Sequence, residues 1–354
     1  MSQTRKIVLM YISDSDLLNN PTQIPQLRIV VTSRCLHSCI YCRPGGETFP
    51  VPFFNEMTPK QIALCTERLV EKGVNEIKIT GGEPLLRNDI FEIIGLLNKL
   101  KIQHLELITR YIKDKEQLSR LLSSEINILN FSLDTVSLPQ WKQIMGNDNL
   151  LNYLNFIEIA AKKKKIKINT VILRGINDNI SDVNNLITYL QNMGGGTIKF
   201  LDYISDIPEY TPSENQLSSN LNFLVDYLED KSLAYETITA AGGLGHPMKK
   251  IKLPGEIEIL VKSADAGAFY GDICFSCSNY PCHDAIMALR LTPDGKLQRC
   301  LRRNDNLLDI QGEIFHGCEM TLVDKALDTY RTARFHTRNE ILQLRQKAID
   351  NEKI

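Results

Sequence analysis

The chain has 354 residues, enough for one large α/β domain with an appended segment, or for two domains. Its 41 Lys and Arg balance 42 Asp and Glu, so the composition indicates neither a nucleic-acid partner nor a membrane surface. No apolar run is long enough to cross a bilayer, and the N-terminus lacks the pattern of a signal peptide. These observations favour a cytoplasmic protein.

Between residues 27 and 202, patterns typical of strands alternate with patterns typical of helices. Strands are predicted at Leu27–Thr32, Glu76–Thr80, His104–Thr109, Ile126–Ser132, Lys167–Leu173 and Thr197–Asp202. Helices are predicted at 58–72, 89–100, 114–123, 150–163 and 182–192. Six such units suit right-handed βαβ crossovers but are too few for a closed eight-stranded barrel. The sequence therefore predicts an α/β fold with a parallel sheet, in the form of an open, partial (β/α)6 barrel.

The remainder of the chain gives weaker patterns. Residues 1–25 predict an irregular lead-in, and 203–219 are rich in Asp, Pro, Ser and Asn, which is typical of a linker. A helix is predicted at 220–230, a mostly irregular segment at 240–255, a short strand at 256–262 and a charged helical tail at 322–353. We therefore expect a lead-in (1–25), a barrel (26–215) and a C-terminal domain with its tail (216–354).

Nine cysteines are present, and all but one fall into two groups. Cys35, Cys39 and Cys42 follow the first predicted strand, and a second group lies between residues 274 and 318. Disulfides are not expected in a cytoplasmic chain that can bury a large core, so the grouping favours metal or iron–sulfur ligation. Cys65 lies within a predicted helix and is expected to be a small buried hydrophobic residue.

The first group has the spacing Cys-x3-Cys-x2-Cys, and Gly81-Gly82-Glu83-Pro84 ends the next predicted strand. Three thiolates on one loop can hold three irons of a 4Fe–4S cluster and leave the fourth iron without a protein ligand. A four-cysteine zinc site is the competing interpretation, but the loop has no fourth nearby ligand apart from His37. Together these motifs resemble the radical S-adenosylmethionine (SAM) superfamily, whose fold is also a partial (β/α)6 barrel.

This resemblance implies an enzyme in which Cys35, Cys39 and Cys42 bind the cluster and the open iron binds SAM. The cluster passes one electron to SAM, which splits into methionine and a 5′-deoxyadenosyl radical, and that radical abstracts hydrogen from the substrate. An external electron donor such as flavodoxin or ferredoxin is the implied protein partner. The implied SAM-binding residues are Gly81, Gly82, Glu83, Ser132 and Asn169.

Motifs in the C-terminal part of the chain indicate which family within this superfamily the sequence resembles. Cys274 and Cys277 have x2 spacing, and RLTPDGKLQRCL follows, ending at Leu301. With LRIVVTSRCLHSCIYC, KITGGEPLLR, FSLDT, KINTVILRGIND and KFLD, these resemble the GTP 3′,8-cyclase family of molybdenum cofactor biosynthesis. In that family three C-terminal cysteines bind a second 4Fe–4S cluster, whose free iron contacts the guanine of GTP. The resemblance implies such an auxiliary cluster on Cys274, Cys277 and Cys300.

Basic residues on or near separate predicted strands match the triphosphate pocket of that family. Cations that point into one barrel mouth from several strands suit a polyanionic substrate. The resemblance therefore implies a phosphorylated nucleoside such as GTP, which the enzyme would cyclise or rearrange. The implied substrate-binding residues are Arg28, Lys78, Lys167, Lys199 and Arg290.

Several positions depart from the family pattern. Ala288 stands where the family has an arginine, and the third predicted strand ends in Thr109-Arg110-Tyr111, not in the usual Thr-Thr-Asn-Gly. The chain ends in Asn-Glu-Lys-Ile, without the Gly-Gly tail that reaches the active site in the family. These departures favour a divergent paralogue, whose substrate need not be GTP.

The segment between Cys277 and Cys300 is longer than in the family and contains Cys282 and His283. Cys282-x12-Gly-x4-Cys fits the half-motif of SPASM and related auxiliary-cluster domains, found in enzymes that modify peptides and other substrates. If Cys282 is a fourth ligand, the auxiliary cluster has no free iron and cannot bind substrate directly. The alternative function is thus a SPASM-like enzyme that modifies a peptide or another small molecule. A structural zinc site, the role of Cys318 and the oligomeric state, a homodimer included, stay open.

Overall fold

The computed structural model describes residues 24–352, except 43–45, 204–216, 239–243, 245–246, 263–266, 283–284 and 318. Nearly all of the predicted lead-in, most of the predicted linker, His283 and Cys318 therefore lie outside the described residues. Among the described helices, none is both long and apolar enough to cross a bilayer.

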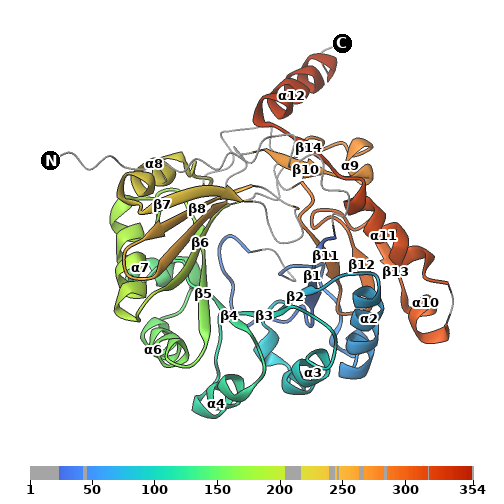
Figure 1. Ribbon diagram of the computed structural model, residues 1–354, viewed down its shortest axis with the longest axis horizontal. Coiled ribbons are helices and arrows are strands. Elements are labelled where there is room, and N and C mark those ends of the chain that lie inside the picture. Colours follow the sequence, from blue (N-terminus) through green and yellow to red (C-terminus); the bar gives the residue numbers. More distant parts are fainter. Residues whose placement is uncertain are drawn as a thin grey trace.

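A curled sheet of twelve strands, in the order β13-β12-β11-β1-β2-β3-β4-β5-β6-β9-β8-β7, forms the centre of the described fold (Figure 1). All neighbours from β11 to β9 are parallel. This confirms the predicted α/β fold with a curled, barrel-like parallel sheet. The strands are β1 Gln26–Val30, β2 Glu76–Thr80, β3 His104–Thr109, β4 Ile128–Ser132, β5 Lys165–Ile172, β6 Gly196–Asp202, β7 Ala234–Ile238, β8 Met248–Leu253, β9 Ile257–Lys262, β11 Ala288–Leu291, β12 Lys296–Gln298 and β13 Leu307–Asp309.

Helices cover the convex face of this sheet, where Figure 1 shows α2, α3, α4, α6 and α7 in a row. α2 begins with a capping box: the Thr58 side chain accepts a hydrogen bond from the Gln61 N–H, and the Gln61 side chain accepts one from the Thr58 N–H. The helices are α2 Pro59–Glu71, α3 Ile90–Leu97, α4 Lys115–Ser123, α5 Leu138–Met145, α6 Leu150–Ala161, α7 Ile180–Asn192, α8 Asn222–Lys231, α9 Asp272–Phe275, α10 Gln311–His316, α11 Thr321–Arg331 and α12 Arg338–Glu352, with 3-10 turns η1 Phe53–Asn55 and η2 Pro84–Leu86.

Alternation along the strands separates the core from the inside of the curl. In β5, Ile166 and Ile168 are buried in the hydrophobic core, whereas Lys167, Asn169 and Val171 line a cavity on the concave side. Successive side chains of a strand point to opposite faces of its sheet. The same alternation in neighbouring strands therefore places polar side chains in one cavity while the apolar ones anchor the helices.

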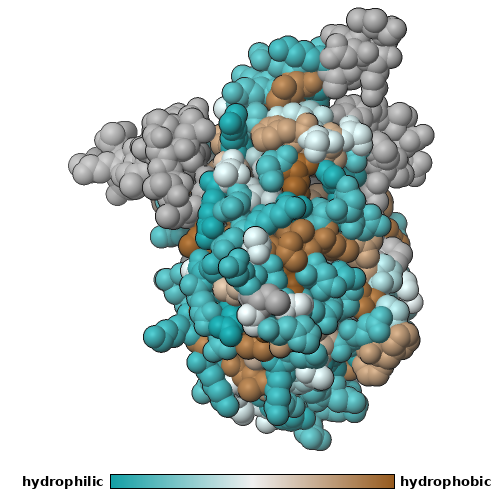
Figure 2. Space-filling model, turned by 90° about the vertical axis from the view of Figure 1, so that its right-hand side faces the viewer, coloured by the Kyte–Doolittle hydropathy of each residue, from teal (hydrophilic) through white to brown (hydrophobic). Residues whose placement is uncertain are grey.

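The C-terminal part of the chain extends the same sheet at both edges. β9 pairs with β6, β11 pairs with β1, and antiparallel strands continue outward on each side. On the face shown in Figure 2, hydrophilic side chains cover most of the surface and hydrophobic ones form smaller groups between them. The predicted boundary at residue 215/216 stays a prediction, but strands from both sides of it are neighbours in one sheet.

Three local predictions were wrong. The segment 240–255 was expected to be mostly irregular, but Met248–Leu253 forms β8, because pairing with β7 and β9 outweighs the nearby glycines and prolines. The tail was expected to be one helix, but Arg334–His336 form β14, which pairs with β10 (Ala268–Tyr270) and separates α11 from α12. Helix α5 was not predicted at all.

Candidate active site

Cys35, Cys39 and Cys42 lie in the loop after β1, at the carboxyl end of the parallel strands. All three line a cavity of about 750 Å³ on the concave side of the sheet. The Cys42 N–H donates to the Cys39 carbonyl at 2.9 Å, so a tight turn holds these two residues together. Burial is the main cause that raises the pKa of Cys39 to about 11; the charge of Arg110 opposes the rise, and the neighbouring Cys42 and Cys35 contribute to it. The structure thus places the three thiols together in the cavity at the carboxyl end of the parallel strands.

The Gly-Gly-Glu-Pro turn after β2 packs directly against this loop. The Gly82 N–H donates to the Thr32 carbonyl and the Glu83 N–H donates to the Arg34 carbonyl, both at 2.7 Å. A Cβ on Gly82 would lie 2.2 Å from the Arg34 oxygen, so only glycine allows this approach. The glycine is therefore needed first for packing of backbone against backbone. Since the Gly82 and Glu83 N–H groups are occupied, this turn can offer a ligand carbonyl acceptors, which suit an ammonium group.

The carboxylate of Glu83 is buried and accepts hydrogen bonds from the protein itself. It accepts hydrogen bonds from the Thr109 hydroxyl at 2.6 Å, the Arg110 N–H at 2.8 Å and the Leu85 N–H at 3.1 Å. Burial raises the pKa of Glu83 to about 7, and these donors oppose the rise. Glu83 therefore fixes the turn after β3 as well as lining the cavity.

Ser132 and Asn169 are register partners on β4 and β5, and both line the cavity. The Oδ1 atom of Asn169 is buried and has no hydrogen-bond partner among the described residues. A buried polar atom without a partner costs free energy, commonly about 1–3 kcal/mol. This orphaned acceptor indicates that a ligand completes the site.

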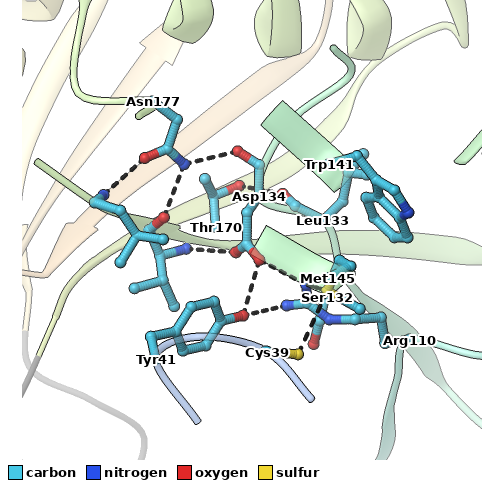
Figure 3. Close-up of polar contacts among 12 residues, drawn as sticks. Cys39, Tyr41, Arg110, Ser132, Leu133, Asp134, Trp141, Met145, Thr170 and Asn177 are labelled. Atoms are coloured by element: carbon cyan, nitrogen blue, oxygen red, sulfur yellow. Dashed lines mark hydrogen bonds and ion pairs between the residues drawn. The ribbon is translucent and has the colours of Figure 1, made fainter. Parts of the chain in front are cut away.

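A polar network joins the cluster loop to the ends of β3, β4 and β5 (Figure 3). Arg110 forms an ion pair with Asp134 at 2.6 Å and a hydrogen bond with the Tyr41 hydroxyl, which itself donates to Asp134 at 2.8 Å. The other carboxylate oxygen of Asp134 accepts from the Val171 N–H at 2.9 Å. Asn177, in the loop after β5, donates to the Asp134 carbonyl at 2.8 Å. The network ties the Cys39–Cys42 turn to the wall of the barrel.

A row of basic side chains lines the opposite part of the cavity. Arg290, Arg28 and Lys78 are successive register partners on β11, β1 and β2. Lys167 and Lys199 come from β5 and β6, and one further lysine ends β9. We call these six residues the cationic belt: Arg28, Lys78, Lys167, Lys199, Lys262 and Arg290.

Carboxylates balance only part of the belt. Glu47 contacts Arg28 at 2.6 Å and Arg290 at 3.5 Å, and Glu106 contacts Lys78 at 3.1 Å. These cations hold the pKa values of Glu47 and Glu106 at about 2, against the opposing effect of burial. Both carboxylates are therefore ionised at neutral pH.

Two amines of the belt form no ion pair or hydrogen bond with any residue that the structure describes: those of Lys167 and Lys199. Burial, and after it the charge of Lys78, lower the pKa of Lys167 to about 8, against the opposing charge of Glu106. Burial and then the charge of Lys167 also hold the pKa of Lys199 well below its ordinary value. The belt is thus a concentration of repelling positive charge that faces a cavity.

The sequence predicted five of these six belt residues and missed Lys262, Glu47 and the network of Tyr41, Arg110 and Asp134. Lys262 ends a predicted strand, but its place beside β6 needed the sheet order. Arg110 had been noticed only as a departure from a motif. No periodicity in the sequence marks Glu47.

The second group of cysteines lies near the same cavity. Cys274 and Cys300 are buried, and Cys277 is partly buried. Burial is the main cause that raises the pKa of Cys274 to about 12; a backbone hydrogen bond with Gly271 opposes the rise, and the nearby Cys300 and Cys277 thiols contribute to it. Leu301, next to Cys300, lines the cavity together with Arg290. The structure therefore brings three of the four described cysteines of this group close together beside the belt.

Cys282 is partly buried, and its Sγ accepts a hydrogen bond from the Ala285 N–H at 3.3 Å. Within the described ranges, no three His, Cys, Asp or Glu side chains converge closely enough to hold a single metal ion. The described residues therefore offer no preformed zinc site, whereas a four-iron cluster is wider than one ion and needs its thiols further apart.

Comparison with known proteins agrees with this geometry. The family model described as "Radical SAM superfamily" matches residues 29–187. A Methanococcus aeolicus protein named "Probable GTP 3',8-cyclase" is 30% identical over 313 residues, which cover 86% of this chain and 95% of that protein. The chain belongs to the radical SAM superfamily. An Archaeoglobus fulgidus protein of the same name is 29% identical over 299 residues, covering 84% of this chain and 91% of its own.

A solved structure shares the fold of this radical SAM protein. Streptococcus suis SuiB bound to S-adenosylmethionine superimposes with a TM-score of 0.59 at 15% identity, covering 87% of this chain and 67% of SuiB. At this identity the likeness concerns the fold alone.

This radical SAM protein is an enzyme, and its superfamily implies a 4Fe–4S cluster and SAM. The residues present fit both groups, because three thiols of one loop face the cavity and the orphaned Asn169 acceptor lies in the same cavity. When bound, the cluster and SAM supply radical chemistry through one-electron reductive cleavage of SAM. The protein's own part is to hold the cluster loop through the Tyr41 network and the Gly82 turn, and to present acceptors beside it.

Proposed function

We propose that this radical SAM enzyme acts on a phosphorylated nucleoside such as GTP, from which it abstracts hydrogen and which it then cyclises or rearranges. The observation that carries the proposal is the cationic belt, whose six cations come from β11, β1, β2, β5, β6 and β9 and line one cavity with the cluster loop. Such a site suits a polyanion that reaches toward the radical chemistry.

The electrostatics of the belt support a phosphate ligand. In the free protein the Lys167 and Lys199 amines repel each other and neither forms an ion pair with a carboxylate of the described residues, so this repulsion costs free energy. A triphosphate would offset that cost, since each charge-assisted hydrogen bond contributes about 1.5–3 kcal/mol. The belt is therefore better explained by a polyanion than by a neutral substrate.

Guanosine is supported by the relatives, which are named GTP 3',8-cyclases. The departures at Arg110 and Ala288 concern residues close to the cluster loop and to Arg290. We therefore propose the nucleotide class, with GTP as its first candidate, and a divergent paralogue of the cyclases as the kind of enzyme.

Cys274, Cys277 and Cys300 would hold an auxiliary 4Fe–4S cluster. Their mutual proximity and the position of Leu301 at the cavity support a cluster that faces the substrate. In this proposal residues 216–354 supply the second cluster, residues 26–215 supply SAM chemistry, and flavodoxin or ferredoxin supplies the electron.

Cys282 favours a second candidate function, a SPASM-like enzyme that modifies a peptide or another small molecule. Its thiol accepts a hydrogen bond from the Ala285 N–H. The hydroxyl of Tyr270, at the end of β10, donates to the Cys282 carbonyl at 2.7 Å. As a fourth ligand it would close the auxiliary cluster to direct substrate binding. A precursor-peptide gene beside this gene would support this candidate.

The test is anaerobic turnover of the reconstituted enzyme with SAM, dithionite and, one at a time, GTP, ATP, CTP, UTP, GDP and guanosine. We expect one nucleotide to stimulate formation of 5′-deoxyadenosine and to be consumed. Lys199→Met should lose the stimulation. Lys165→Met should keep it, because Lys165 begins β5, is exposed and does not line the cavity. Formation of 5′-deoxyadenosine at the same rate with every nucleotide and with none would contradict the proposal.

A further inference from the structure

The guanidinium of Arg110 is held beside the cluster loop, as Figure 3 shows. Its Nη1 atom lies 3.0 Å from the Met145 sulfur, and that sulfur lies 3.4 Å from the Sγ of Cys39. One thioether therefore separates a permanent positive charge from a thiol of the cluster loop. The guanidinium also packs over the Tyr41 ring, 5.7 Å from its centroid.

Both the backbone N–H and the guanidinium of Arg110 are held in place by neighbouring residues. The Arg110 N–H donates to the buried Glu83 carboxylate, and the guanidinium binds Asp134 and the Tyr41 hydroxyl. The Asp134 carboxylate in turn accepts from the Val171 N–H of β5, and the Asn177 side-chain amide donates to the Asp134 backbone carbonyl. Asp134 is buried and the Arg110 side chain is only 10% exposed, so their charges are poorly screened by solvent.

The two charges should act in opposite directions on negative charge at the cluster loop. The Arg110 guanidinium reaches Cys39 through the Met145 sulfur, and both Arg110 and Asp134 contact the Tyr41 hydroxyl of the same loop. From these positions the positive charge should stabilise, and the negative charge destabilise, any negative charge that is placed among the sulfurs.

One-electron reduction adds one negative charge to an iron–sulfur cluster, and no bond forms or breaks. The reduction potential of such a cluster depends on nearby charge, hydrogen bonds to sulfur and exposure to solvent. We propose that the Arg110–Asp134 pair sets the reduction potential of the cluster held by Cys35, Cys39 and Cys42, with Arg110 raising it and Asp134 lowering it. This inference concerns the electron that starts the reaction and does not depend on the identity of the substrate.

The test is a redox titration of reconstituted full-length variants with dithionite, in which electron paramagnetic resonance follows the cluster signal that changes on addition of SAM. Arg110→Gln removes the positive charge, Arg110→Lys keeps it with fewer hydrogen bonds, and Asp134→Asn removes the negative charge at similar shape. Lys113→Gln is the matched control, because it removes an exposed cation from the same β3–α4 loop. Iron content is measured for each variant.

We expect a lower potential for Arg110→Gln, a higher one for Asp134→Asn, a potential near the wild-type value for Arg110→Lys, and no shift for Lys113→Gln. A role in packing alone would shift the Gln and Asn variants in the same direction, or would leave Arg110→Lys as low as Arg110→Gln. Either result would overturn the proposal. If Arg110→Gln loses its iron, the sign of the Asp134→Asn shift decides: an unchanged or lower potential contradicts the electrostatic role.

Discussion

Asn169 on β5 and Lys199 on β6 are register partners, side by side across two parallel strands. Ser132 on β4 is the register partner of Asn169 on its other side. The residues proposed for SAM and the unpaired amine proposed for phosphate thus form one row on the concave face. A substrate held by Lys199 would lie next to the site of radical formation, which hydrogen abstraction requires.

Replacing Lys199 should weaken nucleotide binding but raise the stability of the nucleotide-free protein. Lys199→Met removes a partly buried lysine whose amine has no partner among the described residues and whose charged form is disfavoured, so the nucleotide-free protein should melt at a higher temperature. The same change should weaken GTP binding by about tenfold to a hundredfold, the loss of one charge-assisted hydrogen bond. Calorimetry measures both quantities. Unchanged affinity, or a lower melting temperature, would contradict a site built for a polyanion, and Lys165→Met should change neither.

Nucleotide binding should weaken as the pH rises through the pKa of Lys167, about 8 in the free protein. A bound phosphate favours the charged amine and raises this pKa, so binding takes up protons near pH 8 and the affinity falls toward higher pH. Titration calorimetry in buffers with different ionisation enthalpies measures the proton uptake. Lys167→Arg keeps its charge at every pH, so its uptake should be smaller; equal uptake in the two proteins would assign the protons to another group.

The turn at Gly82 should tolerate no side chain. In Gly82→Ala the new Cβ would meet the backbone of Arg34 and Ser33, so we expect the free energy of unfolding to fall by about 3 kcal/mol or more. Gly95→Ala in α3 is the control, because nothing lies within 4 Å of its Cβ position. In that helix interior alanine should add about 0.5–1 kcal/mol. Urea unfolding of the iron-free protein measures both changes, and equal effects would refute the packing argument.

The two cysteine groups should hold iron independently. After anaerobic reconstitution, Cys35→Ala protein should retain about four irons and matching sulfide, which belong to the auxiliary cluster. Adding Cys274→Ala should remove most of this remainder. Iron and acid-labile sulfide assays give the counts. If Cys35→Ala retains no iron, the C-terminal cysteines hold no cluster.

Much of the barrel follows from local sequence pattern. The bounds of β2 and β3 agree with the prediction to the residue, because in each short strand apolar residues alternate with polar ones and a turn follows. α5 was missed since Pro139 and the short length hide its pattern, although Trp141 is buried in the core. β8 and β14 depend on partners that lie elsewhere in the chain, so local pattern could not identify them.

The candidate site, like the fold, has parts that local sequence identifies and parts that depend on distant partners. Cysteine spacing and the Gly-Gly-Glu-Pro motif are local signals, and they point to the cluster loop directly. Lys262 and Glu47 become relevant only when β9 lies beside β6 and when Glu47 reaches two arginines of different strands. The role of Arg110 needed the contacts of Tyr41 and Asp134, which sequence spacing does not reveal.

The pairing of β1 with β11 has a consequence for biosynthesis. Gln26 is made early and its register partner Ala288 late, so one edge of β1 has no partner while most of the chain is translated. An unpaired strand edge can bind other chains. The nascent protein therefore depends on release of its C-terminal part before the sheet is complete, and a product truncated before β11 should aggregate.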